Sequence, residues 1–355
     1  HVFAGVDDLS KYSLEQHPES WVSGGSITLS EIIPGQRYSF VPNPYYPLRA
    51  AGNETITEFE FVIYPDLNAM QLALQSGNLD LAAPSLPPAA AKAIDGSHGV
   101  TVETVHDALN YSKLSFNASR DALSTAEVRY AIAGLIDTVA LEEAVLQGYG
   151  KSLVGPVLPS YQPKYQPQIT PIHSTVQQTK QTLADAGLSG LSLDLVCDSG
   201  NSNHVKYAGL IKELLSEAEI SVNVNCMERS TSLARAKSGD FDLYIHKLGQ
   251  AWSPGSNLVQ QFHPSNPSGL YYNFVEDPEL VTLLDAVDAQ VEEGHYVTAV
   301  KAAAKYIHEQ VYVLPLYVEA LNSAYSSKRF AGFVPTGMET STMLNPFSLA
   351  QVVPQ

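Results

Sequence analysis

The most constraining feature of this sequence is a regular alternation of strand-like and helix-like segments near its centre. The strand-like runs are 192–197 (SLDLVC), 221–226 (SVNVNC) and 241–246 (FDLYIH), and the helix-like runs between them are 204–220 and 230–240. In the first helix-like run, apolar residues recur every three to four positions, which is the period of an amphipathic helix. This order predicts a parallel sheet with right-handed crossovers, and hence an α/β fold.

Parallel sheets of this kind bind ligands at the carboxyl ends of their strands. The stretch 246–257 (HKLGQAWSPGSN) lies at such an end, and it holds Trp252, one of only two tryptophans in the chain. We expect Trp252 to stack on a ligand, with Gln250, Ser253 and Asn257 as neutral hydrogen-bonding neighbours. The alternative is a tryptophan that only plugs the base of its own loop.

Length and charge limit the possible functions. A chain of 355 residues favours two domains. A net charge of −17 argues against binding to nucleic acid or to an anionic membrane surface. No apolar run is long enough to span a bilayer. The first residues are neither an initiator Met nor a signal peptide, so we expect a chain that is trimmed or cut from a longer one.

The chain has two cysteines, Cys197 and Cys226, and each ends a strand-like run. If these two strands are parallel neighbours, both sulfurs lie at the same edge of the sheet, within reach of a disulfide. This pairing requires an oxidising compartment; two buried free thiols are the alternative.

Known catalytic and metal-binding spacings are absent from the sequence. It has no zinc-protease, nucleophile-elbow or P-loop motif. The ten histidines are scattered, and two cysteines without matching histidines make a poor zinc site. We therefore expect a protein that is not an enzyme and that holds no cofactor or metal.

Further elements are indicated by periodicity and turn residues. Strands are expected at 26–32, 37–43, 56–64, 79–84, 109–116 and 313–318, helices at 66–77, 124–150, 278–291 and 296–311, an extended Pro-rich connector at 155–171, and an irregular tail at 330–353.

Several segments, in order, resemble the extracellular solute-binding proteins of family five, the dipeptide, oligopeptide and nickel receptors of ATP-binding-cassette (ABC) importers. The resemblance runs from about residue 21 to residue 333. The segments that carry it are 34–46 (PGQRYSFVPNPYY), 64–82 (YPDLNAMQLALQSGNLDLA), 114–137 (LSFNASRDALSTAEVRYAIAGLID), 146–159 (LQGYGKSLVGPVLP), 239–245 (GDFDLYI) and 312–318 (YVLPLYV).

This resemblance implies a two-lobed, periplasmic-binding-protein-like fold of type II. Parallel or mixed sheets would be flanked by helices, and hinge closure would enclose the ligand in a cleft between the lobes. The first lobe would hold 1–120 plus 314–355 and would lack its N-terminal section; the second would hold 121–313.

The resemblance further implies a monomeric receptor outside the cytoplasm, either periplasmic or a cell-surface lipoprotein. It would deliver an oligopeptide or another small polar solute to the permease subunits of an ABC importer. A ligand-sensing domain of a signalling protein on the same fold is the alternative. We count Asn117 and Asn273 among the expected ligand-binding residues.

The chain departs from the family pattern in the loop around Trp252. Peptide receptors tend to carry an Asp beside an aromatic there, and this Asp pairs with the amino group of the peptide. The stretch 249–257 (GQAWSPGSN) has no carboxylate. We therefore expect a neutral or anionic ligand, or a peptide whose amine is anchored elsewhere.

Overall fold

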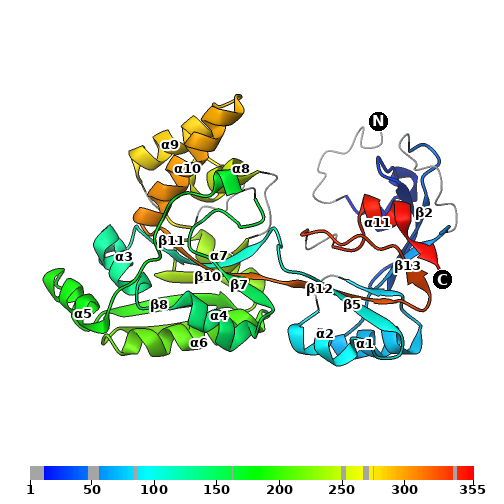
Figure 1. The fold of residues 1–355 in the computed structure, drawn as a ribbon, viewed down its shortest axis with the longest axis horizontal. Helices are drawn as coiled ribbons and strands as arrows, with labels where there is room; N and C mark the ends of the chain where they lie inside the picture. The colour runs from blue at the N-terminus through cyan, green and yellow to red at the C-terminus, as the bar shows by residue number, and fades with distance from the viewer. Residues whose placement is uncertain are drawn as a thin grey trace. The chain divides into compact units, whose positions relative to one another are not determined.

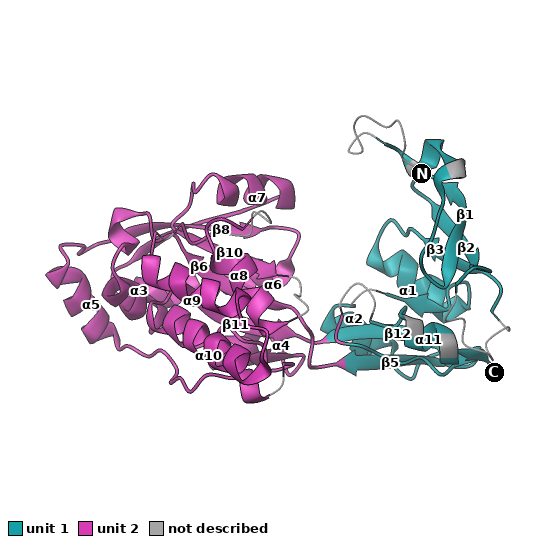
Figure 2. Cartoon of the chain, turned by 90° about the horizontal axis from the view of Figure 1, so that it is seen from above, with its two compact units in different colours: residues 1–104, 321–336, 340–355 teal, residues 105–320, 337–339 magenta. Residues whose placement is uncertain are grey.

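The chain divides into two compact units, which Figure 2 shows in teal and magenta. Unit 1 holds residues 1–104, 321–336 and 340–355, and unit 2 holds 105–320 and 337–339. The computed structural model describes residues 12–46, 56–83, 86–161, 163–248, 253–266, 272–274, 276–338 and 342–355.

Unit 1 is built from small sheets and short helices. Strands β1 to β3 form an antiparallel sheet in sequence order, β4, β12 and β5 form a second sheet in that order, and β13 pairs with β14. The bounds of these strands are β1 Ile27–Ile33, β2 Arg37–Pro42, β3 Phe59–Val62, β4 Leu81–Ala82, β5 Val100–Val105, β12 Leu321–Ser326, β13 Phe330–Ala331 and β14 Val353–Pro354.

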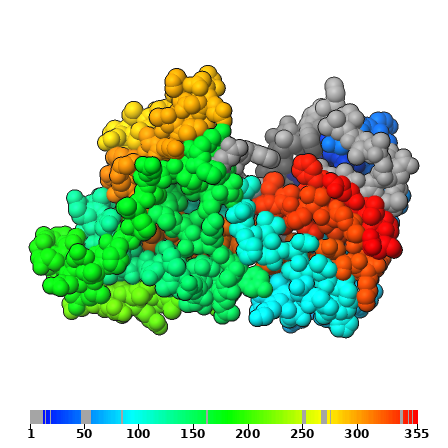
Figure 3. Space-filling model, in the orientation of Figure 1, coloured from blue at the N-terminus to red at the C-terminus, as the bar shows by residue number. Residues whose placement is uncertain are grey.

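The helices of unit 1 are α1 (Leu67–Ser76), α2 (Pro88–Ile94) and α11 (Pro346–Gln351). Buried side chains from α1, α2 and the second sheet make one core, which includes Leu74 and Ile94. Segments far apart in the sequence belong to this unit: on the face shown in Figure 3, the region around residue 90 is cyan and the C-terminal region is red.

Unit 2 contains a six-stranded mixed sheet in the order β7-β11-β6-β10-β8-β9. Strand β8 pairs in parallel with both β9 and β10, whereas β6 is antiparallel to β10 and to β11. Its strands are β6 Tyr111–Phe116, β7 Gly150–Ser152, β8 Ser192–Asp198, β9 Ser221–Met227, β10 Leu243–Leu248 and β11 Val313–Glu319. The expected parallel alternation is thus present, within a sheet that is mixed overall.

Helices cover both faces of this sheet (Figure 1). One face packs on α3 to α6 through a large apolar core, and the other packs on α7 to α10. These helices are α3 Ala126–Ala133, α4 Thr138–Leu146, α5 Val176–Asp185, α6 Ser202–Ser216, α7 Arg229–Lys237, α8 Pro254–Phe262, α9 Pro278–Asp288 and α10 Glu293–Glu309. Short 3-10 turns lie at Leu14–Gln16, Pro18–Ser20, Asp121–Leu123 and Pro163–Tyr165.

Helices α5 and α8 were not predicted from the sequence, although both begin with clear local signals. Helix α5 begins with a capping box, in which Thr175 and Gln178 satisfy each other's backbone amides. Helix α8 begins within the stretch that we interpreted as a loop: Ser253 is its N-cap and Pro254 its first residue. The tail expected to be irregular contains α11, β13 and β14.

The boundaries of the units differ from those expected for the lobes. We expected changes at 120 and 313, but the compact units change at 104 and 320. The physical reason is strand pairing. Strand β6 lies between β11 and β10, so both β6 and β11 are integral to the sheet of unit 2.

Candidate functional site

The carboxyl-end edge of the six-stranded sheet gathers segments from distant parts of the sequence. Strands β8, β9 and β10 run parallel, so their last residues meet at one edge. Because β6 is antiparallel to β10, its first residues lie at the same edge: Leu248 pairs with Tyr111, and His246 pairs with Lys113. This edge of unit 2 is the candidate site.

Helix α8 begins a few residues after β10, and Ser253 fixes its start. The Ser253 hydroxyl accepts a hydrogen bond from the backbone amide of Ser256 (3.2 Å) and donates to the Ser256 hydroxyl (2.9 Å). Tyr296 donates to the same Ser253 oxygen (3.0 Å) and accepts from the amide of Gly255 (2.9 Å). Ser253, expected as a ligand-binding residue, is thus engaged as a helix cap.

Ser253, Asn257 and Gln261 are spaced four residues apart, so they lie along one side of α8. Gln261 Nε2 donates to Asn257 Oδ1, and Gln261 Oε1 accepts from Tyr111 (2.8 Å) and from Lys113. We call Lys113, Tyr111, Gln261 and Asn257 the polar relay. It joins a strand to a helix that lies about 150 residues further along the chain, and all four side chains are buried.

Lys113 is the unusual member of the polar relay, because its side chain is only 1% exposed. Its ammonium lies over the rings of Phe262 (5.0 Å) and Tyr111 (5.8 Å). Among the described residues, no carboxylate pairs with it. Burial holds the pKa of Lys113 well below its usual value, because removal from water disfavours the charged amine.

Two serine–histidine pairs flank Lys113 on β6. Ser112 Oγ lies 3.0 Å from His204 Nε2 on one face of the sheet, and Ser115 Oγ lies 2.9 Å from His246 Nε2 on the other. Burial, reinforced by nearby positive charge, lowers the pKa of His204 to about 3 and that of His246 well below its usual value. Both histidines are therefore held neutral.

His246 also belongs to an aromatic stack. Its ring stacks on Tyr244 with centroids 4.6 Å apart, and the edge-on ring of Tyr272 lies 5.0 Å away. All three side chains are buried. Ser115 and His246 are therefore part of a buried aromatic cluster, and they are not arranged as an exposed nucleophile beside a general base.

Asn117 and Asn273, also expected to bind the ligand, donate hydrogen bonds from their side chains to backbone carbonyls. Asn117 Nδ2 donates to the carbonyls of Gly239 and Phe241, both at 3.0 Å, and its Oδ1 accepts twice from Ser119. Asn273 Nδ2 donates to the carbonyl of Tyr312. Both side chains are almost completely buried, so the geometry gives them structural roles.

Trp252 and Gln250 lie outside the described residues. Their expected contact with a ligand therefore stays a prediction.

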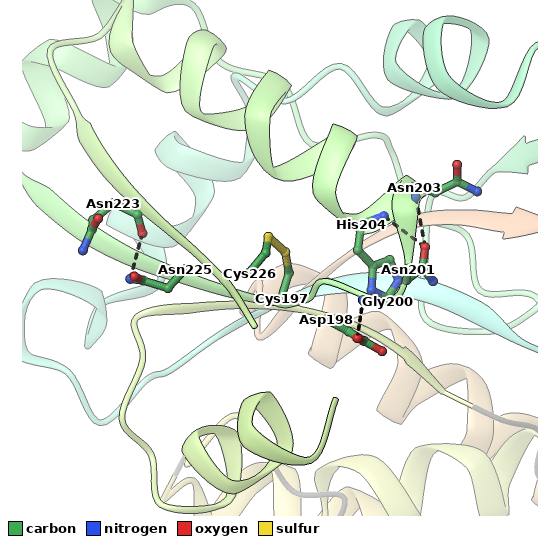
Figure 4. The surroundings of a disulfide bond; sticks show 9 residues. All are labelled: Cys197, Asp198, Gly200, Asn201, Asn203, His204, Asn223, Asn225 and Cys226. Atoms are coloured by element: carbon green, nitrogen blue, oxygen red, sulfur yellow. Dashed lines mark hydrogen bonds between the residues drawn. A yellow bond between two sulfur atoms is a disulfide. The ribbon is translucent and has the colours of Figure 1, made fainter. Parts of the chain in front are cut away.

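The sulfurs of Cys197 and Cys226 form a disulfide in the structure. These two residues face each other in the β8–β9 register, with Cα atoms 4.5 Å apart. Figure 4 shows the bridge beside the turn that leads from β8 into α6, where Asp198 accepts from the amide of Gly200 (2.8 Å). The bridge thus ties the strands together where they reach the candidate edge.

Two hollows of the described surface, one in each unit, lie away from this edge. One in unit 2, of about 410 Å³, is lined by Ser119, Arg129 and Asp277 among others. One in unit 1, of about 370 Å³, lies between β3, the start of β4 and α11.

No group of three or more metal-ligating side chains is found in the described parts of the chain. None of the described helices is long and apolar enough to cross a membrane.

Lys113, Gln261 and His246 were not among the site residues predicted from the sequence. Lys113 could have been singled out from its position in β6. Alternation along the strand places it on the same face as Tyr111, within a run of buried residues. Gln261 had a weaker signal, its four-residue spacing from Asn257.

The sequence profile of the bacterial extracellular solute-binding proteins, family 5 Middle, matches residues 5–269. The chain belongs to this family.

Curated members of family 5 are distant relatives. The chain is 23% identical over 319 residues to the probable D,D-dipeptide-binding periplasmic protein DdpA of Escherichia coli, covering 89% of this chain and 60% of DdpA. It is 24% identical over 347 residues to heme-binding protein A of Haemophilus influenzae, covering 93% of this chain and 62% of that protein. The chain therefore spans less than two thirds of the length of either relative.

Solved family 5 structures share the fold. One is the oligopeptide-binding protein AppA from Bacillus subtilis in complex with a nonapeptide. It superposes with a TM-score of 0.78 at 18% identity, covering all of this chain and 71% of AppA. At this identity the likeness establishes the two-lobed α/β fold and leaves the ligand open.

Proposed function

We propose that this chain is the solute-capturing part of a receptor that serves an ABC importer. The observation that carries the proposal is the family match over residues 5–269. The receptor would act without turnover, passing its solute to the permease subunits of the importer.

The division into two units supports a hinge mechanism. The chain passes from unit 1 to unit 2 near residue 104 and back near 320, and it crosses again around 337–339. Segments that connect two compact units can act as a hinge, because a few residues in each segment can absorb the change in backbone angles. We propose that units 1 and 2 are the lobes and that they enclose the solute on closing.

The solute would be an oligopeptide or another small polar molecule. The relatives support this breadth, since the name of one refers to a D,D-dipeptide and that of another to heme. We propose that Trp252, Gln250 and Asn257 contact the solute at the carboxyl-end edge of the sheet.

We further propose that the receptor works outside the cytoplasm, in the periplasm or as a cell-surface lipoprotein. Supporting this, Cys197 and Cys226 form a disulfide in the structure, and disulfides persist mainly in oxidising compartments.

A thermal-shift panel on the full-length protein tests the function. The panel holds di-, tri- and nonapeptides, heme, and small sugars and organic acids. We expect one class to raise Tm in proportion to the logarithm of its concentration, because a solute that binds only the folded state stabilises it. Mass spectrometry before and after incubation then shows whether that solute is unchanged; chemical conversion would contradict a pure binding role.

A further inference from the structure

The polar relay has a fixed direction, which follows from the donors and acceptors that it joins. A protonated Lys113 can only donate, so the atom facing it is Gln261 Oε1, which also accepts from Tyr111. Gln261 Nε2 must then face Asn257, and it donates to Asn257 Oδ1. Each amide therefore has one allowed orientation.

The end of the polar relay is a hydrogen-bond donor. Because Asn257 Oδ1 faces Gln261, its Nδ2 points the other way. Among the described residues Nδ2 has no hydrogen-bond partner; it is not one of the fully buried polar atoms that lack a partner, so it reaches solvent although the residue as a whole is only 3% exposed. A donor that reaches solvent from an otherwise buried side chain of fixed orientation is available to a solute.

The position of this donor is the one expected for a ligand contact. Asn257 lies in the first turns of α8, four residues after the Ser253 cap. Its neighbour Gln261 contacts Tyr111, which pairs with Leu248 at the carboxyl end of β10. Residues on this side of α8 thus connect the candidate edge with the buried Lys113.

The surrounding charge favours an anionic acceptor. No described carboxylate pairs with Lys113, and among the causes that lower the pKa of the neighbouring His246, after burial, is the positive charge that Lys113 carries when protonated. A buried amine without an acid nearby is a site that an incoming anion stabilises, since the anion supplies the missing opposite charge.

We propose that the polar relay selects solutes with a carboxylate group, with Asn257 Nδ2 donating to a carboxylate oxygen. Lys113, Tyr111 and Gln261 act as positioning residues behind Asn257: they fix its orientation, and a bound carboxylate favours the charged form of Lys113, which in turn favours the carboxylate. The proposal rests on the receptor function and narrows the class of solute that the receptor takes.

Acetate and its neutral counterpart acetamide are suitable probes. In the full-length protein, at constant ionic strength set with chloride, we expect acetate to raise Tm and to bind at least about tenfold tighter than acetamide, since hydrogen bonds to charged groups are worth more than neutral ones. Lys113→Met should abolish this preference while leaving the weak acetamide response unchanged, which a merely structural role would not do. The absence of a preference in the wild type, or its survival in Lys113→Met, would overturn the proposal.

Lys247→Met is the matched control. Lys247 lies on β10 and pairs with Ser112, so its side chain projects from the opposite face to Lys113. We expect this variant to keep the acetate preference. If Lys113→Met does not fold, Asn257→Leu carries the test, because it removes the donor and keeps the charge; it should also lose the preference.

The outcomes separate the polar relay from the receptor function. If a solute from the panel binds but the protein shows no preference for acetate over acetamide, the receptor function stands. The proposed carboxylate selection by the polar relay is then overturned. An acetate preference lost in Lys113→Met, with no panel solute bound, supports the relay and contradicts the function.

Discussion

His204 Nε2 lies 3.0 Å from Ser112 Oγ, and this contact joins the first turn of α6 to the central strand β6 inside unit 2. Both side chains are almost completely buried. The imidazole is held neutral there, because burial and the positive charges of Lys247 and Arg229 lower its pKa to about 3. The pair therefore links the stability of unit 2 to pH.

The first prediction concerns acid. The unfolded chain protonates His204 near its ordinary pKa of 6.5, whereas the folded protein resists protonation down to about 3. Between these values the unfolded state binds more protons, so the free energy of unfolding falls as the pH falls, by up to about 1.4 kcal/mol per pH unit for this group. Urea denaturation at several pH values from 7.5 to about 4 measures this slope.

His204→Gln should flatten that slope, because glutamine cannot take up the proton. His295→Gln is the matched control, since the His295 side chain is 76% exposed. It should keep the wild-type slope. Equal slopes in the wild type and His204→Gln would show that other groups govern the acid sensitivity.

The second prediction concerns the disulfide. We expect no free thiol when the non-reduced protein is denatured and titrated with a thiol reagent. Replacing both Cys197 and Cys226 by alanine should lower the free energy of unfolding by roughly 2–4 kcal/mol, because the bridge restricts the unfolded chain across a sequence separation of 29. Two thiols titrating without reductant would contradict the pairing.

The third prediction concerns Arg129, a buried residue of α3. Its guanidinium donates to the backbone carbonyls of Leu123, Ser124 and Gln310 at 2.7–3.0 Å and lies 4.9 Å from the ring of Tyr312. Arg129→Met leaves these carbonyls unsatisfied, so we expect a loss of at least about 3 kcal/mol in the free energy of unfolding.

The control for Arg129 is a surface cation. Lys180 pairs with Glu219 at 2.7 Å, and both side chains are exposed to solvent. Lys180→Ala should cost less than about 1 kcal/mol, because exposed ion pairs contribute little. A comparable loss in both variants would mean that burial of Arg129 adds nothing.

The fourth prediction separates structure from binding at Asn117. Asn117 directly follows β6, and its side-chain Nδ2 donates to the backbone carbonyls of Gly239 and Phe241. Asn117→Ala should lower the free energy of unfolding by about 1–3 kcal/mol. The affinity for whichever panel solute binds should stay unchanged, as calorimetry below Tm can measure; a selective loss of affinity would restore Asn117 to the ligand site.

The fifth prediction concerns Trp252. Because the chain has only two tryptophans, Trp21→Phe leaves Trp252 as the sole indole reporter. We expect the fluorescence of this variant to change when the panel solute binds, and Trp252→Ala to weaken binding by about 0.5–1.5 kcal/mol through lost stacking. Unchanged affinity in a folded Trp252→Ala would show that the indole serves only packing.

The sequence predicted much of the fold where local patterns encode it. The alternation over 192–246 predicted β8, α6, β9, α7 and β10, and the matched cysteine positions predicted the bridge that the structure contains. Period and capping are properties of neighbouring residues, so they can be read without knowing the partners. Helix α8 was missed although Ser253 and Pro254 form a normal helix start, because its glycine and asparagine resemble a loop.

What the sequence determined by itself is therefore the set of local elements and their class, together with the family resemblance. Only the tertiary structure decided that β6 enters between β10 and β11 and runs antiparallel to both. That pairing brings Lys113 to Gln261, 148 positions away along the chain, and Gln261 in turn donates to Asn257. Such contacts follow from which surfaces the whole chain buries together, and no local pattern of residues records that choice.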